Sequence, residues 1–173
     1  MKGWTITNRR SAVFRPTLRV LAAVAAGATL LTGCSFLSGD APRDESGQVT
    51  SSADAGAMNV RLGDCISDVA LLDGTVETVP VVPCDQPHQG EVFAEQELTE
   101  SSLPDDVPAR ADDFCMGEVV GFLGGEPTGD YANLGIMYLY PTAQSWMLGD
   151  RKIQCIIADE EGKLTGSLKG VLA

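Results

Sequence analysis

The stretch PDDVPARADDFCMGEVVGFLGG, residues 104–125, decides the fold class of this chain. Its apolar residues recur at the i, i+4, i+7 and i+8 spacing of one helical face. Aspartates in its first half suit the positive end of a helix dipole, and Gly124-Gly125 ends the pattern. We therefore expect one amphipathic helix, with an apolar face formed by Val107, Ala111, Phe114, Cys115, Val119 and Phe122.

Short strand-like segments lie on both sides of this helix. Residues 75–82 are rich in β-branched side chains, 91–98 and 151–158 alternate between apolar and polar residues, and 134–140 is apolar and reads as a buried strand. Residues 59–62 and 163–168 are further strand candidates, and 141–146 predicts a short helical turn. The pattern predicts an α+β fold, in which one helix packs on a small antiparallel sheet.

The region that contains these strands and the helix has four cysteines: Cys65, Cys84, Cys115 and Cys155. An even number favours disulfides over a zinc site if the protein is exported, which the N-terminus described next indicates, and no C-x-x-C pair is present. Four cysteines allow three pairings. Helix-on-sheet packing could bring Cys115 to Cys155, and Cys65 and Cys84 flank one strand, so we expect Cys65–Cys84 and Cys115–Cys155.

The N-terminus has the features of a lipoprotein signal peptide. Lys2, Arg9, Arg10, Arg15 and Arg19 precede an apolar run, Val20 to Leu31, that is too short to span a bilayer. The run ends in Leu31-Thr32-Gly33-Cys34, which resembles the lipobox of bacterial lipoproteins. We expect residues 1–33 to be removed and Cys34 to carry the lipid that holds the protein on the outer face of the plasma membrane.

The segment after Cys34 is strongly acidic. Five of the 12 basic residues precede Cys34 and all 24 acidic residues follow it, so the mature chain has a formal charge of 7 − 24 = −17. Such a charge excludes nucleic acid as a partner and repels anionic lipid head groups. Residues 34–58 contain almost no large apolar side chain, and we expect a flexible linker spanning roughly 25–30 Å. Residues 59–173 then form one domain.

An ordered set of short motifs resembles the bacterial septum formation family, whose members are exported or membrane-anchored proteins of the cell envelope. The resemblance implies an extracytoplasmic domain linked to cell division, with no established reaction or cofactor. It covers about residues 60–170 and rests on Gly63-Asp64-Cys65-Ile66, Val82-Pro83-Cys84, Pro87-His88-Gln89-Gly90-Glu91-Val92-Phe93, Cys115, Pro141-Thr142, Ser145-Trp146, Gly149-Asp150-Arg151 and Cys155.

Three groups of residues are candidate sites. His88, with Asp85 and Glu91, could form a catalytic or ligand-binding site, but His88 could equally bond to backbone in a turn. Arg151 could bind an anion or form a turn ion pair with Asp150. Trp146 with Tyr138 and Tyr140 could stack on sugars or fill the core. A hydrolase pair among the carboxylates of Glu91, Glu95, Glu97 and Glu100 is the weakest candidate, because acids are abundant throughout.

These features predict a lipid-anchored envelope protein that is not an enzyme. We expect it to dock onto envelope or division proteins, or onto a wall polymer, without a metal or other cofactor. The alternative is a small ligand-binding lipoprotein or hydrolase that uses the His88 region.

Overall fold

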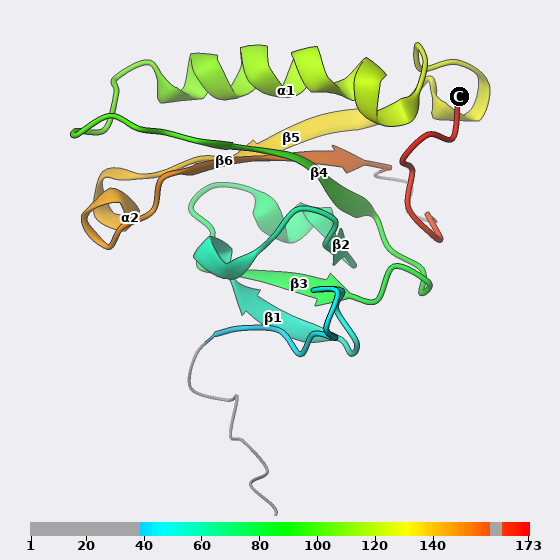
Figure 1. The fold of residues 1–173 in the computed structure, drawn as a ribbon, viewed down its shortest axis with the longest axis horizontal. Coiled ribbons are helices and arrows are strands. Elements are labelled where there is room, and N and C mark those ends of the chain that lie inside the picture. The colour runs from blue at the N-terminus through cyan, green and yellow to red at the C-terminus, as the bar shows by residue number, and fades with distance from the viewer. Residues whose placement is uncertain (1–38, 160–163) are drawn as a thin grey trace, which may run out of the picture. The chain divides into compact units, whose positions relative to one another are not determined.

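The computed structural model describes residues 39–159 and 164–173. The signal peptide and the expected lipidation site at Cys34 lie outside these residues. Six antiparallel strands form one sheet in the order β1-β3-β2-β4-β6-β5 (Figure 1). The strands are β1 (Ala53–Gly56), β2 (Cys65–Ile66), β3 (Thr78–Val82), β4 (Gly90–Glu97), β5 (Gly135–Leu139) and β6 (Lys152–Ala158). The expected α+β class and antiparallel sheet are confirmed.

Helix α1 (Val107–Leu123) covers one face of β4, β5 and β6, as Figure 1 shows. Its predicted face is buried at Val107, Ala111, Cys115 and Val119, and Leu123 extends it to the last turn. Gly124 ends the helix with φ 82°, a left-handed conformation that glycine adopts without strain. The Cys115–Cys155 disulfide joins this face to the middle of β6, in the expected pairing.

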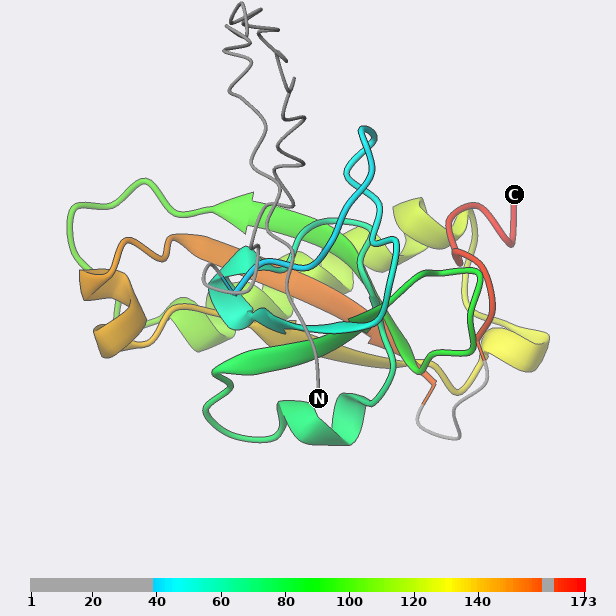
Figure 2. The same ribbon diagram turned by 90° about the horizontal axis from the view of Figure 1, so that it is seen from below.

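A second apolar core lies on the opposite face of β4 and β6. The sheet curls, so that β1, β2 and β3 fold below the central strands (Figures 1 and 2). Ile66, Val79 and Val81 pack there against Val92 and Ile156. The second expected disulfide, Cys65–Cys84, ties β2 to the turn after β3.

Strand β4 contributes to both cores because its register shifts between Val92 and Ala94. The extra residue interrupts the alternation of side chains. Val92 therefore enters the second core, whereas Phe93 and Ala94 both pack beneath α1. The predicted strand at 91–98 is confirmed, but simple alternation does not describe its faces.

The prediction of a flexible linker at residues 34–58 is wrong for residues 39–58. Arg43 pairs with Val49 in a β-bridge, β1 pairs with β3, and Ala41, Val49 and Ala55 are buried in the second core. Their small side chains supply little apolar surface alone. The open edge of β3 supplies the backbone hydrogen bonds that order the segment. The folded domain thus begins by Gly39, twenty residues before the predicted boundary.

Three smaller predictions also need correction. Residues 59–62 form no strand, because the chain turns from Arg61 to Asp64. In the predicted strand at 163–168, Lys163 lies outside the described residues and Leu164 makes a single bridge with His88, after which Gly166 turns the chain at φ 80°. Strand β5 is half-buried, because it lies at the edge of the sheet.

The remaining helices are short. Helix α2 (Ala143–Met147) occupies the predicted helical turn, and 3-10 turns cover Ala57–Asn59, Val69–Leu72 and Gly129–Tyr131. Within residues 39–159 and 164–173, none of the helices has the length and hydropathy needed to cross a membrane.

Candidate functional site

His88 lies in the turn between β3 and β4 and is 2% exposed. Its backbone N–H donates to the Leu164 carbonyl and its carbonyl accepts from the Leu164 N–H, both at 3.0 Å. The Nδ1 atom lies 2.8 Å from the carbonyl oxygen of Gln86. Because a carbonyl can only accept, Nδ1 carries the proton. His88 thus bonds to backbone within a turn, the second of the two interpretations of its role.

The Nε2 atom of His88 is buried and has no hydrogen-bond partner among the described residues. In the neutral imidazole with its proton on Nδ1, Nε2 is an acceptor. An acceptor enclosed in this way cannot reach a substrate from its present position. General-base chemistry at His88 would first require the turn from Cys84 to Gln89 to move.

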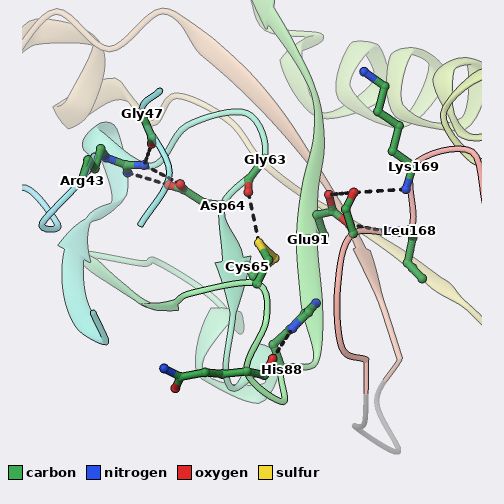
Figure 3. The surroundings of a disulfide bond; sticks show 12 residues. Arg43, Gly47, Gly63, Asp64, Cys65, His88, Glu91, Leu168 and Lys169 are labelled. Carbon is green, nitrogen blue, oxygen red and sulfur yellow. Dashed lines mark hydrogen bonds and ion pairs between the residues drawn. A yellow bond between two sulfur atoms is a disulfide. The ribbon is translucent and has the colours of Figure 1, made fainter. Parts of the chain in front are cut away.

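Glu91, the second residue of β4, has a buried carboxylate, 3% exposed. It accepts hydrogen bonds from Ser167 Oγ at 2.5 Å and from the Leu168 N–H at 2.8 Å. Figure 3 shows the carboxylate turned toward the segment that carries Leu168 and Lys169. Glu91 therefore holds the C-terminal segment against the sheet.

The sequence motif does not assemble into a shared polar site. Asp85 is exposed on the turn, His88 is buried beneath it, and Glu91 points to the C-terminal segment. The carboxylates of Glu95 and Glu100 are each engaged by a basic side chain, Lys152 and Arg110 respectively. No cluster of three metal-ligating side chains occurs in the part of the chain that the structure describes.

A pocket of about 440 Å³ opens between α1, β4 and the C-terminal segment. Phe93 and Phe122, whose ring centroids are 5.4 Å apart, form part of its wall, and Glu91 contributes to its lining. Its rim carries both an acidic and a basic side chain, Glu118 and Lys169. The complete lining consists of Gln48, Leu62, Gly63, Cys84, Glu91, Val92, Phe93, Glu118, Gly121, Phe122, Ser167 and Lys169.

The second motif, around Trp146, is also built into the fold. Thr142 caps α2 through a reciprocal capping box with Ser145, which places Trp146 in the core beneath α1. The guanidinium of Arg151 lies 3.7 Å from the centre of the Trp146 ring and donates to the carbonyls of Trp146 and Asp150. The contact is a cation–π interaction, so Arg151 holds the loop after α2.

Sugar stacking at Trp146 and an ion pair of Arg151 with Asp150 find no matching geometry among the described residues, whereas Trp146 does fill the core. Trp146 is 8% exposed and one face of its ring is covered by Arg151, so it offers no sugar-stacking surface. The expected turn ion pair is replaced by a different contact, because Asp150 Oδ1 accepts from the Lys152 N–H at 3.2 Å. The ring centroids of Tyr138, in β5, and Tyr140, just after it, lie 6.0 Å apart in a tilted pair.

The sequence analysis missed the most deeply buried ion pair of the described residues, Arg43 with Asp64. Their side chains are 7% and 2% exposed, and the two nitrogens of the guanidinium fork lie 2.5 Å and 2.7 Å from the carboxylate oxygens. The hydrogen bonds with Asp64 raise the pKa of Arg43 above its ordinary value. Figure 3 shows the pair beside Gly47, whose carbonyl accepts from Arg43. Asp64 stands in a recognised motif, but no local signal links it to a residue twenty-one positions earlier.

Comparison with known proteins assigns the chain to a family. A family model described as "Septum formation" matches residues 31–155. No curated protein and no solved structure matches the chain. The matched range contains all four domain cysteines, the His88 turn and the Trp146 motif, so the resemblance seen in the sequence motifs is confirmed. Because the model covers well over half of the sequence, the chain belongs to the septum formation family.

Proposed function

We propose that the protein is a lipid-anchored docking module on the outer face of the plasma membrane, and that it acts in septum formation without catalysing a reaction. Membership of the septum formation family supports a role in cell division and the envelope. The lipid anchor and the docking activity go beyond what family membership supports, and each rests on separate observations.

The observation that carries the proposal is the way in which the motif side chains are used. His88, Glu91 and Arg151 all bond to backbone atoms of neighbouring segments, and these contacts hold turns in place. A catalytic group has to lie within hydrogen-bond reach of a substrate. Side chains that hold turns in place, by contrast, keep the backbone around them rigid, and a pre-organised surface loses little entropy on binding a partner.

Export is supported by the cysteines. Both disulfides link segments that are far apart in sequence, and disulfides of this kind persist in oxidising compartments. The lipobox-like Leu31-Thr32-Gly33-Cys34 supports attachment at Cys34. Mass spectrometry of the protein purified from its native membrane tests this part. We expect acyl chains on Cys34 and no free sulfhydryl.

The docking activity is tested by crosslinking in living cells. A strain that carries an affinity-tagged chain is treated with a crosslinker, and the captured proteins are compared with those from a strain that carries only the tagged lipobox segment. We expect the full chain to capture division or envelope proteins and the control to lose them. Capture of none, together with normal septa after deletion of the protein, would contradict the proposal.

A His88→Ala variant distinguishes docking from the alternative, a hydrolase or ligand-binding lipoprotein. Since the His88 side chain is buried and bonded to the Gln86 carbonyl, we expect a lower melting temperature and a loss of function only in proportion to the loss of folded protein. Asp85→Ala, at an exposed position of the same turn, is the matched control and should change neither property. Loss of function at an unchanged melting temperature would favour the alternative.

A further inference from the structure

One long segment of this acidic protein contains no charged residue. Residues 131–149, YANLGIMYLYPTAQSWMLG, lack Asp, Glu, Lys, Arg and His, although the chain after Cys34 has many acidic residues on either side of it. The segment includes β5 and α2. Its own residues therefore add no electrostatic repulsion from anionic lipid.

This segment also carries the most exposed large apolar side chains of the described residues. Met147 is 80% exposed and Leu148 is 70% exposed, and both lie at the end of α2. Tyr140, just after β5, is 38% exposed. We call Tyr140, Met147 and Leu148 the apolar end. Exposed apolar clusters of this kind commonly mark interaction sites.

The apolar end lies at the same end of the sheet as the first described residues. The carbonyl of Gly39 accepts a hydrogen bond from the side chain of Asn59. Val60 follows Asn59 in the sequence, and its carbonyl accepts hydrogen bonds from the side chains of Lys152 and Gln154. Lys152 begins β6, directly after the loop that follows α2. Figure 1 shows α2 at this end, where β4 finishes and β6 starts.

The covalent distance from Cys34 to this end is short. Only four residues separate Cys34 from Gly39, and five fully extended Cα–Cα steps span at most about 18 Å. A diacylated Cys34 lies at the membrane surface. The entry point of the domain is therefore held within about 18 Å of that surface, much closer than the linker expected from composition would allow.

We propose that the apolar end contacts the phospholipid bilayer to which Cys34 is anchored, and that Met147 and Leu148 enter its interfacial layer. The proposal rests on the lipid anchor of the proposed function. Anchoring raises the effective concentration of the domain at the bilayer, so that a few apolar side chains suffice for a contact that they could not make alone. Of the acidic groups nearest in sequence and pairing, Asp150 and Glu95 lie beside the basic residues Arg151 and Lys152, and the exposed Glu97 is the register partner of Lys152.

Site-specific labelling of the full lipidated chain tests this contact. Since the four domain cysteines are paired and Cys34 is acylated in the proposal, Met147→Cys introduces one free thiol for an environment-sensitive fluorophore. The protein is reconstituted in vesicles of phosphatidylcholine and phosphatidylglycerol. We expect a shift of the emission to shorter wavelength, and quenching by brominated acyl chains.

Leu71→Cys is the matched control. Leu71 is 61% exposed, but it lies in the 3-10 turn whose Val69 N–H donates to Gln89, next to Gly90 at the opposite end of β4. We expect no shift and no quenching there. Replacing Leu148 with Ser should reduce quenching at position 147 without lowering the melting temperature, because the side chain is largely exposed.

Equal responses at positions 147 and 71, in protein that floats with the vesicles, would overturn the membrane contact and leave the anchor intact. Protein that does not float with the vesicles would instead contradict the lipid anchor. A shift at position 147 that persists in detergent and disappears on dilution of the protein would identify a second copy as the occupant, and would also overturn the proposal.

Discussion

At the scale of single residues, the polar side chains of this domain act as links between chain segments. Arg43 and Asp64 join the N-terminal segment to the loop before β2, Glu91 joins β4 to the C-terminal segment, and His88 holds the turn between β3 and β4. Each link bridges segments that are distant in sequence or shapes a turn between strands. Their chemical identity was visible in the sequence, but their partners were not.

Substitution of Asp64 by Asn tests the buried ion pair. The change removes the carboxylate that bonds to the buried Arg43 guanidinium and leaves only that of Asp40, 3.7 Å from Nε, and we expect a loss of about 3–5 kcal/mol in the free energy of unfolding. Denaturant titration of the purified protein measures it. The double variant Arg43→Met with Asp64→Leu should be closer to the wild type, because both charges are removed together. A single variant as stable as the wild type would contradict this account.

At the scale of elements, β4 and β6 contribute to both cores, and α1 covers one of them. The prediction of α1 succeeded because its apolar periodicity is a local property, and the predicted edges of β3, β4, β5 and β6 were within a few residues of the observed ones. The prediction failed for β1, whose sequence Ala53–Gly56 has no strand signal and is ordered by pairing with β3. It also failed at residues 164–168, where the Glu91 carboxylate accepts a hydrogen bond from the Leu168 N–H.

Removal of each disulfide should destabilise the domain by an amount that follows the length of the closed loop. The paired cysteines are 40 residues apart in Cys115–Cys155 and 19 apart in Cys65–Cys84, so the chain-entropy model gives about 3.9 and 3.3 kcal/mol. Alanine at both members of each pair, followed by denaturant titration, measures the two losses. The larger loss is expected for Cys115–Cys155, which also crosses the α1 core. The reverse order would contradict the model.

The start of α1 should give part of the stability a dependence on acid pH. A hydrogen bond from Arg110 lowers the pKa of Glu100 below its ordinary value of 4.5. The Glu100 carboxylate therefore binds a proton more readily in the unfolded chain than in the folded one. The contribution of the Glu100–Arg110 pair to the free energy of unfolding is complete above pH 4.5 and is lost as the pH falls through the lower pKa of Glu100 in the folded state.

Glu100→Gln should accordingly show a shallower loss of stability on acidification than the wild type. Urea titrations at neutral pH and at a pH below the ordinary carboxylate range measure the difference. Because the pair is exposed, we expect a small effect that added salt reduces. Glu126→Gln, at another exposed position, is the control and should follow the wild type. An identical acid response in Glu100→Gln would contradict the role of the pair.

At the scale of the whole molecule, the folded domain extends to Gly39, and this shortens the connection to Cys34. The sequence predicted a long flexible spacer, whereas residues 39–58 complete the second core. If Cys34 is lipidated as proposed, the shorter connection holds the domain closer to the membrane than a linker over residues 34–58 would.

A charge placed in β1 tests whether this segment belongs to the fold. Ala55 is 0% exposed in the second core, so Ala55→Asp should lower the free energy of unfolding by about 3 kcal/mol or more. Ser51→Asp, at an exposed position just before the strand, should have little effect. The melting temperatures of the two variants show whether the segment is folded or a flexible linker, since a flexible linker would tolerate both changes equally.

The sequence by itself determined the α+β class, the position of α1, the two disulfides and the family, because each depends on local periodicity or on residue types in a fixed order. Only the tertiary structure decided that residues 39–58 are folded, that Arg43 meets Asp64, and that Glu91 holds the C-terminal segment. These contacts join residues 21 to 77 positions apart. Their free energy arises from burial and pairing across that separation, for which a single sequence contains no local signal.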